Sequence, residues 1–378
     1  MAPVALDVAH KLEETFQPSV LTAKAKLPSL TESYKTLPAQ WMRDESIFEL
    51  EKRAIFSKVW LLTSHTCHFS KPGDYISGNY VFSYFIIRDR DDNYQAFHNF
   101  DEVEGFDKAA NGLFKIHTHV TPQGFIFLNF DASPNPVPFE EHFAQLPAEW
   151  KDTDFSEYEP YYNRQALGNF NWKVMTDGYQ ECYHCPIAHP GFADSLDLKN
   201  YQVEPLTNSA RHSAPKKSNP EEMQRFTFVF PTNGVTVTPE MWYIMRTVPL
   251  SATTTRMEFD VRAIITVFSR KGVSQDVLLE NREFFTQVQK EDFDLCEGVQ
   301  RGLNAGVYST GVLHPKEENG VLYYQSRVLH YCESHLEAER RTGKEIHPSR
   351  PSQEASSDSC SASRICSELD EGKGTLAW

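Results

Sequence analysis

The sequence predicts an α+β fold in two domains: a small antiparallel β-sheet domain, then a larger domain in which a curved antiparallel sheet wraps a long helix. Three observations lead to this prediction. Short β-rich segments bounded by Gly, Asp and Pro dominate the first part of the chain, longer β-rich segments follow, and one long helical pattern begins near residue 274. With 378 residues, the chain is long enough to bury a core in each domain.

The smaller domain is expected at residues 41–150, after a lead-in of residues 1–40. Its first element is one amphipathic helix over 45–60, where apolar residues recur at helical spacing. Further β-rich segments follow at 75–89, 94–100, 113–121 and 124–131. The proline-rich stretch "ASPNPVPFE" then marks the end of this domain.

The larger domain is expected at residues 151–335. The segments "RFTFVFP", "MWYIMRTVPL" and "TRMEFDVRAIITVFSR" predict strands of its curved sheet, and residues 274–303 predict its long helix. Apolar side chains form a stripe along that helix: Val277, Leu278, Phe284, Phe285, Val288, Leu295, Val299 and Leu303. Residues 336–378 have too few large apolar residues to order themselves, so we expect a flexible polar tail.

Composition excludes several classes of partner. The 52 Asp and Glu outnumber the 37 Lys and Arg, and the formal charge of −15 disfavours nucleic acid and anionic membranes. No apolar run approaches membrane-spanning length and the N-terminus lacks targeting features, so a cytoplasmic protein is expected. The 7 cysteines form an odd set without a regular framework, so disulfides are not their expected role.

The stretch "NWKVMTDGYQECYHCPIAHP", residues 171–190, is dense in groups that bind metals. If it is helical, Asp177, Glu181 and His184 fall at i, i+4 and i+7 and line one face. Pro186 is then expected to end or kink the helix, so that the following loop brings His189 back beside His184. Asp177 and Glu181 are the candidate catalytic carboxylates.

Asp292 lies inside the apolar stripe of the long helix. A carboxylate directed into a core needs a cation or strong donors, and a metal is one such partner. Together, His184, His189 and Asp292 would form the two-histidine, one-carboxylate set of non-haem Fe(II) oxygenases. A zinc hydrolase with the same ligands remains an alternative. The nearby Cys182 and Cys185 are expected to be packing residues around the site.

Over roughly residues 38–335 the sequence resembles the Rieske-type non-haem iron oxygenase α subunits, the aromatic-ring-hydroxylating dioxygenase family, in the branch of choline and carnitine monooxygenases. The most specific motifs are "NWKVMTDGYQECYHCPIAHP" and "EDFDLCEGVQRGL", with "AFHN" and "GFIFLNFD" upstream. The resemblance implies a Rieske-like β domain, a helix-grip (START-like) catalytic domain, and iron ligated by His184, His189 and Asp292. It also implies a homotrimer in which Glu181 links the iron to a neighbouring subunit's cluster; Gly178 stands where the family usually has Asn.

The β domain departs from this family at the cluster. Family members follow "AFHN" with C-x-H and later C-x-x-H, whose two Cys and two His hold a Rieske [2Fe–2S] centre. Here the sequence continues directly from Asn99 to Phe100, and no cysteine occurs between Cys67 and Cys182. We therefore expect a truncated Rieske-like domain without cluster ligands. Three interpretations remain open: an incomplete gene model of an active oxygenase, a cluster-less relative with another electron source, and an inactive binding protein.

The resemblance implies an Fe(II)- and O2-dependent monooxygenase that converts choline to betaine aldehyde in glycine betaine biosynthesis, with an NAD(P)H-dependent reductase or ferredoxin as electron donor. Proteins usually bind quaternary ammonium groups against the faces of aromatic rings. The candidates lie in strand segments: Phe226, Phe228, Phe230, Trp242 and Tyr243, of which Phe228, Phe230 and Trp242 are the predicted substrate-binding residues. A non-catalytic helix-grip protein that binds a small molecule is the alternative to an enzyme.

Overall fold

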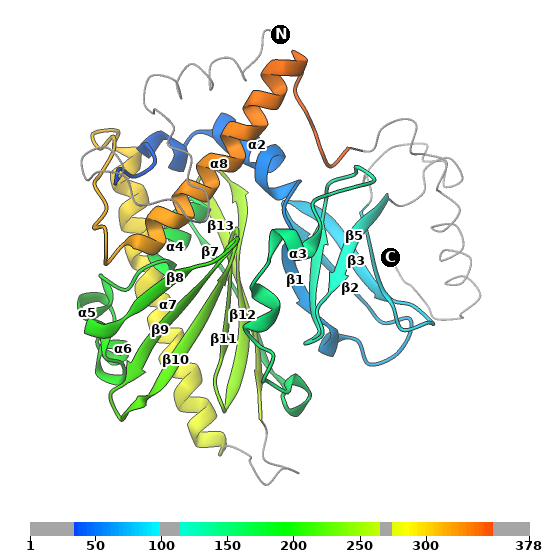
Figure 1. Cartoon of the computed structure of the whole chain (residues 1–378). Coiled ribbons are helices and arrows are strands. Elements are labelled where there is room, and N and C mark those ends of the chain that lie inside the picture. The colour runs from blue at the N-terminus through cyan, green and yellow to red at the C-terminus, as the bar shows by residue number, and fades with distance from the viewer. Residues whose placement is uncertain (1–33, 99–113, 265–273, 351–378) are drawn as a thin grey trace. The chain divides into compact units, whose positions relative to one another are not determined.

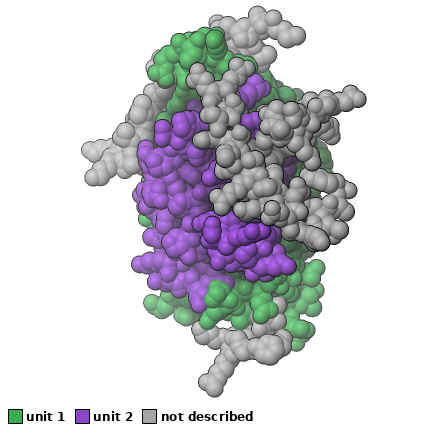
Figure 2. Space-filling view, turned by 90° about the vertical axis from the view of Figure 1, so that its right-hand side faces the viewer, with its two compact units in different colours: residues 1–55, 156–346 green, residues 56–155, 347–378 purple. Residues whose placement is uncertain are grey.

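The computed structural model of this chain describes residues 34–98, 114–264 and 274–350. It divides into two compact units, which Figure 2 colours separately. Unit 1 comprises residues 1–55 and 156–346, and unit 2 comprises residues 56–155 and 347–378. The four-part division expected from the sequence stays a prediction, although its boundary at 335/336 is corrected below.

Unit 2 contains a six-stranded antiparallel sheet with the strand order β1-β6-β5-β4-β3-β2. Its strands are β1 (Leu61–His65), β2 (Tyr75–Tyr80), β3 (Phe82–Arg88), β4 (Tyr94–His98), β5 (Phe114–Val120) and β6 (Phe125–Asn129). Every residue of β1 and β6 is buried, including the polar residues Thr63, Ser64 and His65 of β1 and Asn129 of β6. The junction between Asn99 and Phe100 lies outside the described residues.

Unit 1 contains a seven-stranded antiparallel sheet in the order β7-β13-β12-β11-β10-β9-β8 (Figure 1). Its strands are β7 (Glu159–Gly168), β8 (Gln202–Pro205), β9 (Ser209–Lys216), β10 (Asn219–Val229), β11 (Asn233–Val237), β12 (Met241–Ser251) and β13 (Thr254–Ala263). The first strand in sequence, β7, pairs with the last, β13, along its whole length. The sheet is curved, so the predicted α+β class is confirmed.

The long helix α7 (Gln275–Asn304) begins where the Ser274 side chain caps the backbone N–H of Val277. Its Leu278 packs with Met241 and Val261 of the sheet. The remaining helices are α2 (Glu45–Glu51), α3 (Phe139–His142), α4 (Trp172–Tyr179), α5 (Cys185–Ala188), α6 (Pro190–Ser195) and α8 (Asn319–Thr342), with short 3₁₀ turns at Ala39–Met42, Thr66–His68, Leu146–Ala148, Phe155–Glu157 and Leu198–Asn200. No helix in the described ranges is long and apolar enough to cross a membrane.

Two expected elements are corrected. The single helix expected over 45–60 is the shorter α2, capped by Asp44 and followed by a π-helical turn at Lys52–Phe56. The flexible tail expected from residue 336 is also wrong at its start, because α8 continues to Thr342 and ends at Gly343 in the left-handed conformation, φ 66°. The rest of that tail, residues 351–378, lies outside the described residues.

A buried ion pair fixes the start of α4, the helix that leads into the predicted metal site. Lys173 Nζ donates to Glu51 Oε1 over 2.6 Å, and both side chains have 0% exposed surface. Trp172 Nε1 donates to the other oxygen of Glu51 over 2.8 Å. The side chain of Asn171 caps the helix by accepting from the backbone N–H of Lys173. The position of α4 is therefore set by buried polar contacts to α2.

Candidate metal centre

The chain does not form the continuous helix that was expected to carry Asp177, Glu181 and His184 on one face. Helix α4 ends at Tyr179. Beyond it, the carboxylate of Glu181 accepts hydrogen bonds from the backbone N–H groups of Tyr183 and His184. A continuing helix would direct those same N–H groups to backbone carbonyls four residues earlier. The Glu181 side chain thus replaces the helix with a tight turn.

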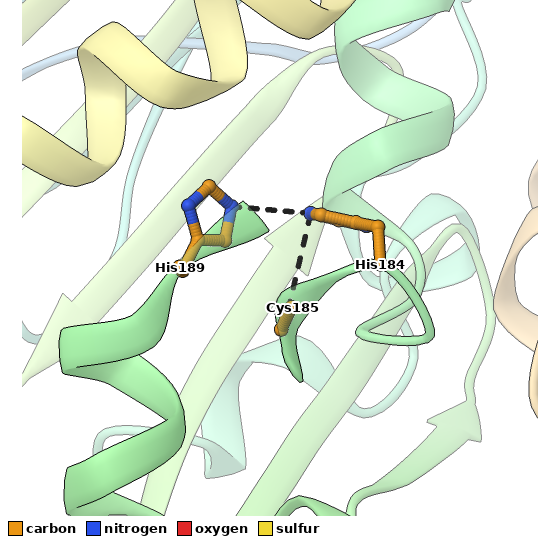
Figure 3. Close-up of side chains that lie close together, drawn as sticks. All are labelled: His184, Cys185 and His189. Atoms are coloured by element: carbon orange, nitrogen blue, oxygen red, sulfur yellow. Dashed lines mark hydrogen bonds between the residues drawn. The ribbon is translucent and has the colours of Figure 1, made fainter. Parts of the chain in front are cut away.

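The short helix α5 brings the two histidines together. His184 is its N-cap and His189 its C-cap, so one helical turn separates them, and their Nε2 atoms lie 3.2 Å apart (Figure 3). Pro186 lies in the first turn of α5, where a missing N–H costs nothing. The predicted convergence of the imidazoles is thus present, but Pro186 opens a new helix and does not break an old one.

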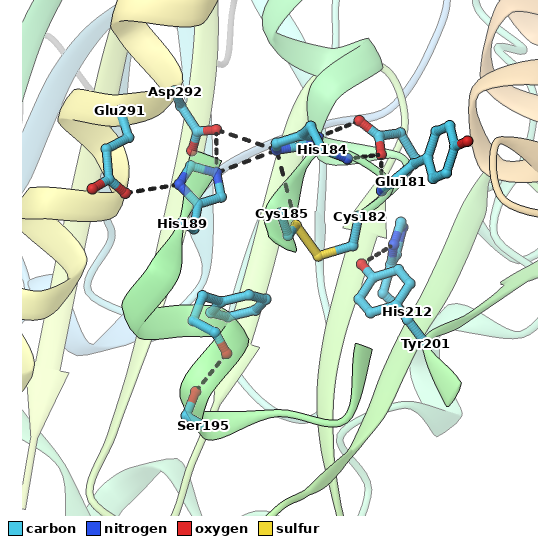
Figure 4. Close-up of a disulfide and its surroundings, with 12 residues drawn as sticks. Glu181, Cys182, His184, Cys185, His189, Ser195, Tyr201, His212, Glu291 and Asp292 are labelled. Carbon is cyan, nitrogen blue, oxygen red and sulfur yellow. Dashed lines mark hydrogen bonds and ion pairs between the residues drawn. A yellow bond between two sulfur atoms is a disulfide. The ribbon is translucent and has the colours of Figure 1, made fainter. Parts of the chain in front are cut away.

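Asp292, from the middle of α7, meets both rings. Its Oδ1 lies 3.0 Å from His189 Nε2 and 3.7 Å from His184 Nε2 (Figure 4). Ligands that share one ion through bonds of about 2.0–2.2 Å lie roughly 3–3.5 Å apart. These separations and the two-nitrogen, one-oxygen donor set fit a divalent metal such as Fe(II).

Carboxylates on the far side of each ring orient the histidines. Glu181 pairs with Nδ1 of His184, and Glu291 accepts from Nδ1 of His189 over 2.9 Å. Because a carboxylate only accepts, each Nδ1 carries the proton and each Nε2 is left to face the centre. Glu291 was not among the site residues expected from the sequence. Its one signal was Gln287 one turn earlier, which donates to Glu291 over 2.8 Å.

The charges around the rings favour a cation between them. Burial lowers the pKa of His184, but hydrogen bonds with Asp292 and Glu181 outweigh burial and raise that pKa to about 9. Burial raises the pKa of Asp292, but the two histidines outweigh burial and lower it. The site therefore holds a positive charge against its carboxylates, and a metal ion can take the place of that proton.

Cys182 and Cys185 form a disulfide at this site, drawn in yellow in Figure 4. From the sequence, no disulfides were expected and both cysteines were expected to be packing residues, and both expectations are wrong for this pair. Their C-x-x-C spacing, with His184 between them, was the signal in the sequence. Cys185 Sγ lies 3.9 Å from His184 Nε2.

The predicted ligands border a cavity of about 970 Å³ within unit 1. The cavity-facing side of α7 includes Phe285, Val288, Asp292, Leu295 and Val299. Much of the apolar stripe of this helix therefore lines a cavity and is not part of a packed core. This explains why Leu295 and Val299 are 43% and 51% exposed. Aromatic rings from the sheet and helices form much of the remaining wall: Tyr162, Phe192, Phe226, Tyr243, Phe259 and Phe285.

The three predicted substrate-binding aromatics are not among the residues that line this cavity. Phe228 and Phe230 pack against Tyr324 of α8, with ring centroids 5.8 and 6.3 Å apart. Trp242 is fully buried on the face of β12 opposite to Tyr243, because neighbouring residues of a strand alternate. Of the five aromatic candidates, only Phe226 and Tyr243 reach the cavity.

Asp177 also lines the cavity, near the end of α4. Gln325 of α8 donates to its Oδ2 over 2.8 Å, and burial raises its pKa to about 8. At neutral pH this carboxyl is therefore largely protonated and can donate as well as accept. Its hydrogen bond to Gln325 does not join it to the histidines, so of the two candidate catalytic carboxylates only Glu181 contacts a histidine.

Comparison with known proteins identifies the class of this site. Residues 155–334 match the family model of the ring hydroxylating alpha subunit (catalytic domain). Among curated proteins, the carnitine monooxygenase oxygenase subunit of Acinetobacter baumannii is 26% identical over 362 residues, covering 78% of this chain and 94% of that protein. The chloroplastic choline monooxygenase of Amaranthus tricolor is 24% identical, covering 76% of each chain.

Solved structures agree with this assignment at the level of the fold. A quaternary ammonium Rieske monooxygenase bound to an inhibitor superposes with a TM-score of 0.70 at 23% identity, covering 81% of this chain and 99% of that one. A naphthalene 1,2-dioxygenase superposes with a TM-score of 0.59 at 15% identity, covering 83% and 97%. Residues 155–334 therefore match the catalytic domain of the ring hydroxylating alpha subunits, and the curated relatives of the chain are Rieske-type monooxygenases, a class of oxidoreductases. The resemblance inferred from its motifs is confirmed.

Proteins of this family use a mononuclear iron and a Rieske [2Fe–2S] cluster, and the cluster motif does not fit this chain. The spacing C-x-H occurs at Cys182–His184 and C-x-x-H at Cys332–His335. Cys182 is in the disulfide, and Cys332 and His335 lie buried on α8, where His335 pairs with Glu339. Both pairs belong to unit 1, and no described residues of unit 2 supply the Cys₂His₂ set.

Proposed function

We propose that this chain is a monooxygenase of quaternary ammonium compounds whose mononuclear iron is held by His184, His189 and Asp292. The observation that carries the proposal is the meeting of two Nε2 atoms and one carboxylate oxygen, 3.0 to 3.7 Å apart, at the wall of an aromatic cavity. When bound, the iron supplies the activation of dioxygen that hydroxylation requires. Glu181 and Glu291 hold the histidines in the orientation that presents Nε2 to the metal.

The wall of the cavity supports a cationic substrate. Aromatic faces attract quaternary ammonium groups through their negative quadrupole, and Tyr243 and Phe285 present adjacent rings with centroids 5.4 Å apart. Glu181 and Glu318 add acidic groups to the same wall. The substrate is therefore held with its cation among the rings and with a carbon next to nitrogen near the histidines.

Choline and carnitine are the two substrate candidates, and Arg164 separates them. Arg164 lines the cavity two residues from Tyr162 on β7 and therefore on the same side of the strand. Choline carries no anion for this guanidinium, whereas the carboxylate of carnitine would accept from it. The motifs lead us to propose choline oxidation to betaine aldehyde. Carnitine is the second candidate, and the presence of Arg164 in the cavity wall supports it.

The electrons for oxygen activation must come from a donor other than the described part of this chain. Hydroxylation with dioxygen needs two electrons besides those of the substrate, and the chain lacks the cluster motif that carries them in this family. We propose that a reductase or ferredoxin serves as donor, in a homotrimer in which Glu181 faces the donor's path. Three copies of the chain mass in light scattering are the expected result, and a monomer at working concentration contradicts that assembly.

Iron binding tests the ligand assignment. Anaerobic titration with Fe(II) is expected to load about one iron per chain without labile sulfide, and Asp292→Ala is expected to lose most of that iron. Asp294→Ala is the matched control, because Asp294 is exposed on the same helix and should keep full iron. A chain that remains free of iron, or an Asp292→Ala variant that keeps it, refutes the assignment.

Substrate oxidation is tested without any redox partner. Hydrogen peroxide carries the oxygen atom and the two electrons, so the iron-loaded chain is expected to convert choline or carnitine in its presence, with product detected by mass spectrometry. An Arg164→Leu variant is expected to lose carnitine turnover by about tenfold and to keep choline turnover, because one charged hydrogen bond is lost. Hydrolysis of esters by a zinc-loaded chain with no oxidation of either amine would instead identify a zinc hydrolase.

A further inference from the structure

The Cys182–Cys185 disulfide lies against the proposed iron ligands. His184 stands between the two cysteines in the sequence, and all three residues line the cavity. The Sγ atom of Cys185 and ring nitrogens of His184 and His189 lie within 4.8 Å of one another. Only 7% of Cys182 and 4% of Cys185 is exposed, so the pair is reached through the cavity.

Opening this disulfide would create a fourth ligand. Sulfur and nitrogen atoms bound to one zinc ion through bonds of about 2.3 and 2.0–2.1 Å lie roughly 3.5 Å apart. Cys185 Sγ is already 3.9 Å from His184 Nε2, so a movement of a few tenths of an ångström brings it to this distance from that nitrogen, and it lies within 4.8 Å of a ring nitrogen of His189. A bonded disulfide sulfur is a poor ligand, whereas a thiolate strongly favours zinc over iron.

We propose that Cys182 and Cys185 form a redox-controlled arm of the metal centre. Whether their disulfide is closed or open determines which metal the centre binds. With the disulfide closed, His184, His189 and Asp292 leave open positions, as an Fe(II) oxygenase requires. With the disulfide open, the Cys185 thiolate completes a four-ligand tetrahedral set that holds zinc and leaves no position for dioxygen. This proposal rests on the ligands assigned under the proposed function.

The chemistry of the switch balances with an external thiol. Two thiol molecules reduce the disulfide, giving two cysteine thiols and one disulfide of the external thiol, so two electrons and two protons enter the chain. On binding zinc, the Cys185 thiol loses its proton to solvent. Reoxidation by a disulfide of the same class reverses both steps and releases the fourth ligand.

Cobalt(II) tests the proposal, because it replaces zinc and shows a near-ultraviolet sulfur-to-metal charge-transfer band only when a thiolate binds it. The full chain, stripped of metal, is loaded with cobalt under anaerobic conditions before and after reduction by a phosphine. We expect the band only in the reduced protein, with zinc binding on the order of tenfold or more tighter than in the oxidised protein. Thiol trapping and mass spectrometry report the state of the pair.

Three variants make the test specific. Cys182→Ser cannot form the disulfide and is expected to show the band without reductant, whereas Cys185→Ser is expected to lack it in both states. Cys296→Ser is the control, because Cys296 is a free cysteine that also lines the cavity, and it should behave as the parent protein.

The outcomes separate this inference from the proposed function. Cobalt binding of equal strength in both redox states without a thiolate band overturns the redox arm and leaves the three-ligand site intact. A band that persists in Cys185→Ser also overturns it, since another cysteine is then the ligand. Failure of Fe(II) and cobalt to bind in either state refutes the metal site itself.

Discussion

At the scale of single residues, the centre depends on the way each imidazole is held at both nitrogens. His189 is only 3% exposed and lies between two consecutive residues of α7, with Glu291 at Nδ1 and Asp292 at Nε2. A fixed Nδ1–H keeps the ring in the tautomer that presents Nε2, which raises the affinity of the site for metal. Glu291 is therefore expected to act on the metal through His189 without touching it.

Removing Glu291 should weaken iron binding. Glu291→Ala is expected to lower the affinity for Fe(II) by about 10- to 100-fold, because the orienting partner of His189 is lost. The measurement is anaerobic titration of the metal-free protein, with Glu280→Ala as the control at an exposed position of the same helix. Equal affinities for the two variants would show that the contact does not orient the ring.

Asp177 should make stability depend on pH. Burial raises its pKa in the folded chain to about 8 from an ordinary value of 3.8, so the folded state binds the proton more tightly. Its contribution to the free energy of unfolding is fully present below pH 4 and is lost as pH rises through 8. Asp177→Asn removes this dependence, because an amide accepts from Gln325 without titrating.

The expected result is a variant that gains stability relative to the parent as pH rises from about 4 to 8, reaching roughly 5 kcal/mol, because each of about four pKa units corresponds to about 1.4 kcal/mol. Urea denaturation at several pH values measures the difference. A difference that stays constant over this range would show that Asp177 is ionised in the folded protein throughout.

At the scale of elements, the centre is assembled by short helices with strongly defined ends. Helix α4 begins at the Asn171 cap and is anchored by the buried Lys173–Glu51 pair. It ends where Glu181 captures the next N–H groups, and α5 then spans the interval between the two histidines. The anchor of α4 thus determines where the following turn and both imidazoles lie.

Breaking that anchor should destabilise the whole unit. Lys173→Met leaves the Glu51 carboxylate buried without its cation, and a loss of roughly 3 kcal/mol in the free energy of unfolding is expected. Burial already raises the pKa of Glu51, so the loss should shrink at low pH, where the carboxyl is protonated.

The double variant Glu51→Gln/Lys173→Met provides the control, since it leaves no buried charge. It is expected to recover much of the stability lost by Lys173→Met, as measured by thermal and chemical denaturation. A double variant less stable than the single one would indicate that the pair contributes through packing and not through charge.

At the scale of the whole molecule, elements with periodic apolar residues could be predicted from the sequence, whereas structure set by hydrogen bonds from a single side chain could not. Strands β2 to β6, β10, β12 and β13 and helix α7 could be predicted because their apolar residues repeat over many positions, whereas β1, β7, β8, β9 and β11 were not predicted. Helix α8 was not predicted, although Val321, Tyr324 and Val328 recur at helical spacing, and its last residues, from 336, were assigned to a polar tail. The turn after Tyr179 was missed because it depends on one carboxylate, Glu181, whose hydrogen bonds override local helix propensity.

The predicted ligands illustrate the same limit. Their meeting was predictable because His184, His189 and Asp292 occur in specific motifs, whereas Glu291 and the cavity wall were not, because both depend on tertiary packing. Phe228 and Phe226 lie on the same side of β10 by alternation, yet only Phe226 reaches the cavity. Tyr179 and Tyr324 pack against Phe228, and nothing in its own strand indicates their presence.

The pairing of β7 with β13 has a consequence for how the chain is made. During synthesis β7 emerges early, but its partner strand leaves the ribosome only after the rest of the sheet, and α7 with Asp292 follows later still. Contacts between segments so distant in the chain form slowly, and an unpaired strand edge is prone to aggregate meanwhile. The two histidines can meet Asp292 only after α7 has emerged, so the proposed metal site is completed late in synthesis. Yield in a host cell should therefore respond to growth temperature and chaperone supply more than to iron in the medium.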